Sequence, residues 1–224
     1  MRFGVLGTGM VGKAIASRLV EVGHEVCMGS RTADNEEATS WASGAGDSAA
    51  HGTFADAAAF GEVLFNCTGG MVSVAACEAA GEDNIGDKVL IDVSNPLDFS
   101  HGMPPSLSVA NTDSVGEQLQ RRFPRARVVK SLNTMNCSVM VNPSALPGHH
   151  NVFVSGDDAD AKKAVRGILG QFGWPEAAVI DLGDIKSARG AEALVLFWVF
   201  LRGALGDNQF NLGVVPPPAP PSSA

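Results

Sequence analysis

The chain has 224 residues, 45% of them apolar, with 16 lysines and arginines against 24 aspartates and glutamates, for a net charge of −8. The apolar content excludes disorder for the bulk of the chain. The acidic balance argues against general nucleic-acid binding and against docking on an anionic membrane, because both need a basic footprint. The length corresponds to about one and a half domains of ordinary size, so we expect no separate large catalytic domain beside a nucleotide-binding domain.

Neither a secretory signal nor a membrane span is visible in the sequence. The start, MRFGVLGTGM, lacks the apolar region and cleavage site of a signal peptide. The longest apolar run covers residues 193–201, whereas a span needs about 20 residues. The cysteines at 27, 67, 77 and 137 form no Cys-x-x-Cys pair. We therefore expect free thiols in a reducing cytoplasm, no metal site and no membrane association.

Short apolar runs alternate with helix-like segments along the chain. The first part predicts strands at residues 2–6, 25–28, 63–67, 89–93 and 128–132. It predicts helices at residues 10–22, 34–42, 54–60, 74–80 and from Ser114 to about 123. A strand at 151–154, a helix at 157–171 and a strand at 179–182 follow. This alternation predicts an α/β fold of Rossmann type, a doubly wound, mostly parallel sheet with helices on both faces.

A long apolar segment and a proline-rich end complete the chain. Residues 187–205 predict a helix that is apolar on nearly all faces, as is typical of a helix buried between elements or between subunits. We therefore expect a homodimer. Residues 216–224 hold five prolines and predict a disordered tail. The expected organisation is a nucleotide-binding domain at 1–142, a small α/β extension with the late helix at 143–215, and the tail.

The sharpest motif is a GxGxxG loop between the first predicted strand and helix, made of Gly7, Thr8, Gly9, Met10, Val11 and Gly12. In this motif the first glycine permits a tight turn and the second lets the backbone approach a pyrophosphate. The third lets the helix pack closely on the strand. The helix N-terminus then offers free N–H groups to phosphates. The loop therefore predicts a dinucleotide site.

The end of the second strand indicates which dinucleotide is bound. NAD-specific folds place an Asp or Glu there to hold the ribose 2′-hydroxyl. This chain instead has Ser30, Arg31 and Thr32. No carboxylate repels a 2′-phosphate, the hydroxyls can donate to it, and an arginine can neutralise it and stack on the adenine. We therefore predict NADP(H) rather than NAD(H).

Three further strand ends are expected around the rest of the cofactor, because ligands bind beyond the carboxyl ends of parallel strands. The small side chains after the third predicted strand suit the diphosphate, and two asparagines suit the ribose or the carboxamide. These residues are Cys67, Thr68, Gly69, Asn95, Pro96 and Asn133. Each taken alone also fits ordinary turn chemistry.

Several segments, in order, resemble the NADPH:coenzyme F420 oxidoreductase family. They are GVLGTGMVGKAIASRLVEVGHEVCMGSRT, VVKSLNTM, VFVSGDDADAKKAV, VIDLGDI and GALG. The resemblance covers nearly all of residues 1–215, and the sequence is more distantly similar to the oxidoreductase domain of the STEAP metalloreductases. It implies an NADP-binding Rossmann domain with a small extension, in which Thr8, Ser30 and Arg31 hold the NADP phosphates.

The resemblance also implies a small-molecule redox acceptor, coenzyme F420, whose deazaflavin ring stacks on the nicotinamide. Both reacting rings then belong to cofactors, so no catalytic side chain is expected. Besides Asn95 and Pro96, we expect the acceptor cleft to be walled by residues from a strand end, a loop and the late helix: Leu97, Met135, Leu196 and Phe197. For the last two, packing in the core or in a dimer is the competing interpretation.

Three alternatives remain open. The first is an NADPH-dependent flavin or ferric-chelate reductase, and the second a β-hydroxyacid or imine reductase. The hydroxyacid class needs a Lys-x-x-x-Asn pattern, whereas Lys186 is followed four residues later by Gly190 and Lys130 has Asn133 three residues later. The third is a non-catalytic NADPH-binding module. Mixing NADPH with candidate acceptors discriminates among them.

Overall fold

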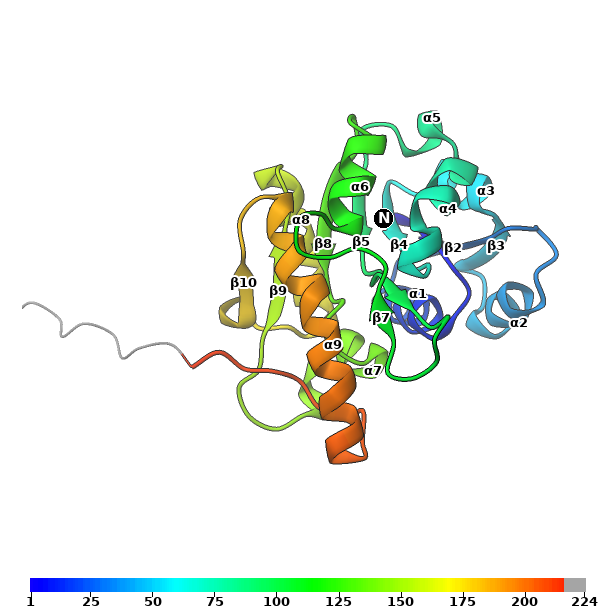
Figure 1. Ribbon diagram of the computed structural model, residues 1–224. Helices are drawn as coiled ribbons and strands as arrows, with labels where there is room; N and C mark the ends of the chain where they lie inside the picture. Colours follow the sequence, from blue (N-terminus) through cyan, green and yellow to red (C-terminus); the bar gives the residue numbers. More distant parts are fainter. Residues whose placement is uncertain (216–224) are drawn as a thin grey trace, which may run out of the picture.

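A single eight-stranded sheet forms the centre of the molecule in the computed structural model, which describes residues 1–215. The strand order is β10-β9-β8-β5-β4-β1-β2-β3 (Figure 1). Neighbouring strands are parallel except for β8 and β9. The strands are β1 (Arg2–Leu6), β2 (Glu25–Ser30), β3 (Ala49–Thr53), β4 (Val63–Asn66), β5 (Val89–Asp92), β8 (Arg127–Ser131), β9 (Val152–Ser155) and β10 (Val179–Asp181). The predicted Rossmann-type, mostly parallel sheet is confirmed. The predicted tail at 216–224 lies outside the described residues.

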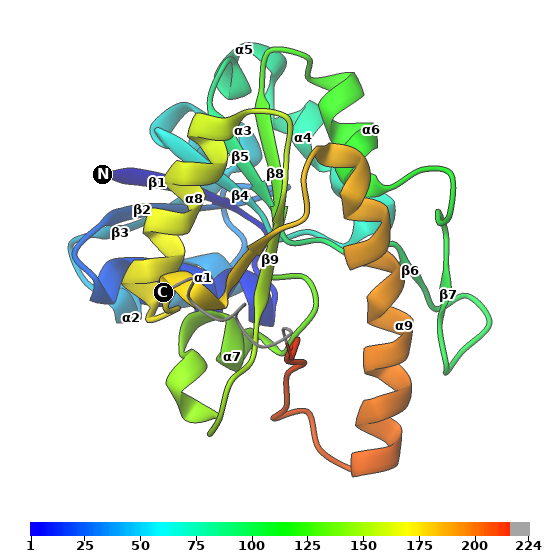
Figure 2. The ribbon, with the colours of Figure 1, turned by 90° about the vertical axis from the view of Figure 1, so that its left-hand side faces the viewer.

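Helices cover both faces of this sheet (Figure 2). On one face lie α1 (Met10–Glu21), α2 (Glu36–Ala45), α7 (Cys137–Val141) and α8 (Ala159–Phe172). On the other lie α3 (Phe54–Phe60), α4 (Ser73–Ala80), α5 (Glu82–Ile85), α6 (Val115–Arg122) and the start of α9 (Ala188–Leu205). Short 3₁₀ turns at η1 (Gly70–Val72), η2 (Pro143–Ala145), η3 (Glu176–Ala178) and η4 (Ile185–Ser187) join these elements.

Two hydrophobic cores result, one on each side of the sheet. In β4, Val63 and Phe65 contribute to the first core, and Leu64, between them, contributes to the second. Successive strand residues point to opposite faces, so a strand covered on both sides must be apolar throughout. This requirement explains why most strands were recognisable as short, uninterrupted apolar runs.

Some elements were not predicted. Strand β3 has the sequence AAHGT, which offers few apolar or β-branched side chains, and it lies at the sheet edge. The short helices α5 and α7 were also missed, as was the antiparallel ribbon of β6 (Leu97–Asp98) and β7 (Ser106–Leu107). Elements of two to five residues carry too little periodicity to be recognised. The strands β9 and β10 of the predicted extension join the same sheet as the first part of the chain.

Helix α9 is less buried than its composition predicts. Its buried residues, Ala188, Ala191, Glu192 and Val195, form a stripe in its first half only. In the second half Phe197, Phe200 and Leu205 are 53%, 60% and 60% exposed. The expectation of an all-round buried helix is therefore wrong for one copy of the chain. Nevertheless, none of the helices within residues 1–215 is long and apolar enough to cross a membrane.

Candidate functional site

The glycine loop between β1 and α1 has the geometry that its motif demands. Gly7 has a φ of 120°, a left-handed region that favours glycine, and a Cβ there would lie 2.9 Å from the Cys67 carbonyl oxygen. A Cβ on Gly12 would lie 2.0 Å from the Gly7 carbonyl oxygen, so only glycine lets α1 approach this closely. By contrast, a Cβ on Gly9 would meet nothing within 4 Å. The space in front of Gly9 is open to a ligand.

The N-terminus of α1 has the features of an anion-binding site. Its N-cap, Gly9, provides no side-chain hydrogen bond, and its first turn holds no acidic residue. The first N–H groups of a helix have no partner within the helix and carry the positive end of its dipole. Thr8 and Val11 are half-buried here, and Met10 is exposed. The chain thus offers a diphosphate both free donors and room, and these residues fit the predicted dinucleotide.

A cavity of about 490 Å³ lies between the ends of β2 and β4. Its lining residues are Arg31, Phe54, Thr68, Val72, Ala75, Ala76 and Ala79. The structure therefore brings Arg31, at the end of β2, together with Thr68, at the end of β4, as the sequence predicted. The apolar wall from α3, η1 and α4 was not predicted. Its signal in the sequence is the run of small residues in SVAACEAA, which leaves space beside a helix.

The other predicted residues near this cavity differ in availability. Ser30 is buried, and its hydroxyl donates to the carbonyl oxygen of Thr32, whereas Thr32 and Gly69 are exposed. The Thr68 hydroxyl donates to Asn66 Oδ1 at 2.6 Å. Burial raises the pKa of the Cys67 thiol, with a further contribution from the negative charge of Asp92. Cys67 is therefore a neutral thiol and not a thiolate nucleophile.

At the ends of β5 and β8 the two predicted asparagines bind each other. Asn95 Nδ2 donates to the Asn133 carbonyl oxygen at 2.7 Å, and Asn133 Nδ2 donates to Asn95 Oδ1 at 2.9 Å. Asn133 Nδ2 also donates to the Ala191 carbonyl oxygen of α9 at 3.0 Å. An amide nitrogen has two donors, so Asn133 can offer a ligand only its Oδ1 as an acceptor. Nearby, the buried Ser94 Oγ has no hydrogen-bond partner among the described residues, as expected of a group that awaits a ligand.

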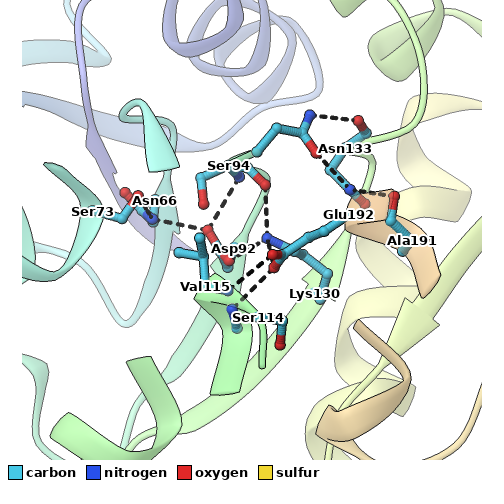
Figure 3. Close-up of polar contacts among 12 residues, drawn as sticks. Asn66, Ser73, Asp92, Ser94, Ser114, Val115, Lys130, Asn133, Ala191 and Glu192 are labelled. Carbon is cyan, nitrogen blue, oxygen red and sulfur yellow. Dashed lines mark hydrogen bonds and ion pairs between the residues drawn. The ribbon is translucent and has the colours of Figure 1, made fainter. Parts of the chain in front are cut away.

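Directly beneath these loops lies a buried ion cluster (Figure 3). Lys130 Nζ, on β8, lies 2.6 Å from Asp92 Oδ2 at the end of β5 and 2.8 Å from Glu192 Oε1 on α9. Its third donor goes to the Ser94 carbonyl oxygen at 2.7 Å. All three N–H groups of the ammonium are thereby paired.

The two carboxylates of the cluster also accept hydrogen bonds from groups other than Lys130. Asp92 Oδ1 accepts from Asn66 Nδ2 at 2.8 Å and from the Ser94 backbone N–H at 3.1 Å. The Glu192 carboxylate accepts the first N–H groups of α6, those of Val115 at 2.9 Å and Gly116 at 3.1 Å. Hydrogen bonds and ion pairs thus connect Asn66, which also accepts from the cavity-lining Thr68, with α9.

The electrostatics of the cluster exclude Lys130 as a general base. Burial by itself would lower the pKa of Lys130, but the carboxylates of Asp92 and Glu192 more than offset this and raise it. Burial raises the pKa of Glu192 against the opposing effect of Lys130. Lys130 is thus a protonated ammonium with no free donor. The other candidate, Lys186, is an exposed residue of η4.

Sequence reasoning did not select Asn66, Asp92 or Glu192 as site residues and considered Lys130 only for a pattern that it fails. A signal existed, since each charged residue stands alone in an apolar stretch: LIDV, VVKS and AEALVL. A lone charge on a buried face must be paired. The sequence does not tell which residues form the pairs.

The residues predicted for the acceptor cleft differ in exposure, and none of them lines the cavity near the end of β2 or the groove beside the end of α9. Met135 is buried, Leu97 and Leu196 are half-buried, and Phe197 is exposed. A groove of about 510 Å³ beside the end of α9 is lined by other residues: Met103, Val199, Arg202, Gly203, Gly206, Asp207 and Asn208. Within residues 1–215 no group of three or more His, Cys, Asp or Glu side chains could hold a metal ion.

Known proteins similar to this chain identify its family. Residues 2–96 match the profile of a family described as NADP oxidoreductase, coenzyme F420-dependent. A crystal structure from Arthrobacter sp. FB24, provisionally described as an F420-dependent NADP reductase, is 48% identical with a TM-score of 0.91. That similarity covers 96% of this chain and 100% of the other.

Two further similarities are more distant. Metalloreductase STEAP3 of Rattus norvegicus is 30% identical over 197 residues, 87% of this chain, although the chain spans 36% of that relative's length. A reductive aminase from Aspergillus terreus, solved with NADPH and ethyl-5-oxohexanoate, is 18% identical with a TM-score of 0.62, covering 92% of this chain and 62% of that one. The last similarity concerns the fold alone, whereas the near-complete match at 48% identity extends over the whole site. The chain belongs to the family of F420-dependent NADP oxidoreductases and is an NADP-dependent oxidoreductase.

Proposed function

We propose that this oxidoreductase transfers hydride between NADP(H) and a flavin-like ring, with coenzyme F420 as the acceptor. One observation carries the proposal: at the ends of β5 and β8, the charged side chains are closed into the cluster of Asp92, Lys130 and Glu192, with no free acid or base among them. Hydride transfer between two carrier rings needs no such group, because the protein has only to position the rings and exclude water.

For the dinucleotide, we propose that its adenosine half lies in the cavity beside Arg31 and Thr68. Arg31, exposed at the cavity edge, is suited to pair with the 2′-phosphate. The diphosphate would meet the free N–H groups of α1 in front of Gly9. The nicotinamide half would reach the edge formed by Asn95, Pro96 and Asn133.

When bound, the dinucleotide supplies a hydride from C4 of its nicotinamide ring. The overall change is NADPH plus acceptor plus one proton giving NADP⁺ plus the doubly reduced acceptor, the proton coming from solvent. The chain's residues orient both rings: the Asn95–Asn133 pair fixes the backbone on one side, and the buried Met135 supplies an apolar contact. Proximity of this kind accounts for much of the rate that two-substrate enzymes achieve.

Mixing purified protein with NADPH and coenzyme F420 and following the nicotinamide absorbance tests the proposal. Rapid, protein-dependent oxidation of NADPH is expected with F420 and only slow oxidation with FMN or a ferric chelate. If NADPH is oxidised with none of these acceptors although it binds, the chain is a binding module and hydride transfer is refuted.

The similarity to a metalloreductase favours a second candidate, an NADPH-dependent flavin or ferric-chelate reductase. A free flavin could bind at the same edge, formed by Asn95, Pro96 and Asn133, because its flat ring would make the same apolar contact with Met135. Turnover with FMN plus ferric chelate but not with F420 would favour this candidate over the first.

We propose further that α9 pairs with α9 of a second copy. Phe197 and Phe200, three residues apart, are neighbours on the surface of the helix, and both are exposed, as is Leu205 near its end. Of the charged residues in α9, Arg189 and Glu192 are bonded to the body of the same chain, which leaves Arg202. An uncharged apolar stripe can meet its own copy across a two-fold axis without repulsion.

Light scattering tests this pairing. We expect twice the chain mass for the wild type, the single-chain 23.1 kDa for Phe200→Glu, and a dimer for the control Leu182→Glu, another exposed apolar residue. A wild-type mass of one chain at micromolar concentration contradicts the proposal.

We also propose that the protein resides in the cytoplasm. Its four cysteines are free thiols, as is typical of proteins in a reducing compartment.

A further inference from the structure

The first turns of α9 are bonded directly to one loop at the nicotinamide edge and, through Lys130, to the other. The Ala191 carbonyl oxygen accepts from Asn133 Nδ2 in the loop after β8. The next residue, Glu192, contacts Lys130, whose ammonium also donates to the Ser94 carbonyl oxygen in the loop after β5. Two consecutive residues of one helix thus hold two loops that are separate in the sequence (Figure 3).

The loop after β8 needs such support. Leu132, which joins Lys130 and Ser131 to Asn133, has a φ of 63° and is buried. A bulky residue other than glycine rarely adopts this left-handed conformation, and it persists only where the surroundings hold it. On its two sides, Lys130 and Asn133 both bond to α9. The contacts with α9 therefore supply the restraint that the strained turn requires.

We propose that Glu192 is a positioning residue: through Lys130 it fixes the loops that receive the nicotinamide half of NADP(H), so that α9 is part of the cofactor site. The inference rests on the NADP(H) site proposed above. It goes beyond that site because Glu192 touches neither the cofactor cavity nor the glycine loop. Glu192 is 2% exposed, and its carboxylate bonds inside the protein, to Lys130 and to the start of α6.

According to this proposal, the two halves of the dinucleotide depend on different parts of the protein. The adenosine half depends on the glycine loop, Arg31 and the cavity beside α4. The nicotinamide half depends on the loops after β5 and β8. Replacing the carboxylate of Glu192 by an amide places an NH₂ group against an ammonium or a backbone N–H, since Gln has only one acceptor oxygen. Lys130 then loses one of its three partners, and the turn at Leu132 loses one of its two contacts with α9, while the adenosine half keeps its contacts.

Two probes measure this separation by calorimetry: NADP⁺, and 2′,5′-ADP, which lacks the nicotinamide half. For Glu192→Gln, we expect the dissociation constant of NADP⁺ to rise about tenfold relative to that of 2′,5′-ADP. For Glu192→Asp, which keeps the charge, we expect the ratio of the two dissociation constants to rise less than for Glu192→Gln. Thermal unfolding checks that each variant is folded. If Glu192→Gln does not fold, Glu192→Asp provides the test: a raised ratio supports the inference, and an unchanged ratio overturns it.

Arg189→Gln is the matched control. Arg189 lies on the same helix and pairs with Glu117 of α6 at 2.6 Å, but it has no bond to either nicotinamide loop. We expect its loss to lower stability and leave the ratio unchanged. An unchanged ratio in folded Glu192→Gln, or an equal loss for both probes, overturns the inference. If the wild type binds neither probe, the proposed cofactor site fails and the inference fails with it.

Discussion

Two alanine substitutions in the glycine loop separate folding from binding. In Gly12→Ala the new Cβ would lie 2.0 Å from the Gly7 carbonyl oxygen. Since such contacts need ~3 Å, α1 or the loop must move by about 1 Å, and overpacking of this kind costs about 3 kcal/mol. Alanine recovers about 1 kcal/mol over glycine inside a helix. We therefore expect a net loss of about 2 kcal/mol in the free energy of unfolding.

Gly9→Ala perturbs a different property. Its Cβ meets nothing within 4 Å, and the φ of −75° suits alanine. The N-cap position slightly favours glycine, so stability should fall by about 0.5 kcal/mol. The methyl group would, however, stand in front of the α1 N-terminus, where we place the diphosphate. A tenfold or greater loss of NADPH affinity, about 1.4 kcal/mol, is expected.

Urea unfolding gives the stabilities of both variants, and a fluorescence titration gives their NADPH affinities. The reasoning fails if Gly12→Ala is as stable as the wild type, because the calculated contact would then be relieved without cost. It also fails if folded Gly9→Ala binds NADPH like the wild type, because the diphosphate cannot then pass in front of Gly9.

Other substitutions test single interactions. Arg31→Ala should weaken NADPH binding at least tenfold and leave NADH binding unchanged, as titration with both can check; an equal loss for both would refute a 2′-phosphate contact. Lys130→Met leaves two buried carboxylates without a cation and should destabilise the protein by about 3–5 kcal/mol in urea. The third test concerns Asp113, whose pKa Arg121 lowers from 3.8 to about 2. Because the folded pKa lies below the unfolded one, the pair stabilises above pH ~4 and this contribution disappears as the pH falls to ~2. After allowance for solvent screening, Asp113→Asn should cost about 1 kcal/mol at pH 6 and only a small fraction of that at pH 2, and a constant difference would contradict this.

Helix α9 shows how far composition can be trusted. Its apolar sequence predicted the helix itself to within a residue, since helix formation depends on neighbours three and four positions away. The same composition predicted burial on all sides, which one copy of the chain does not provide. Burial depends on what other elements, or another chain, place against each face, and no local pattern contains that information.

In the candidate site, too, some features were predictable from the sequence and others were not. Gly7, Gly9 and Gly12 were assigned their roles from the sequence, because a tight turn and a close helix–strand contact are local demands on the backbone. Asn95 and Asn133 were expected to face the cofactor, yet their amides bond mainly to each other. Both residues lie at strand ends, as predicted, but a side chain's partner depends on which strands become neighbours.

The sequence by itself thus determined the alternating strands and helices, the phosphate loop and the absence of a carboxylate after β2. Each of these features follows from interactions between residues close in the chain. Only the tertiary structure decided that Asp92, Lys130 and Glu192 form one buried cluster and that α9 bonds to the loop after β8. Burying a charge requires a partner, and sheet order and helix docking bring these distant residues together.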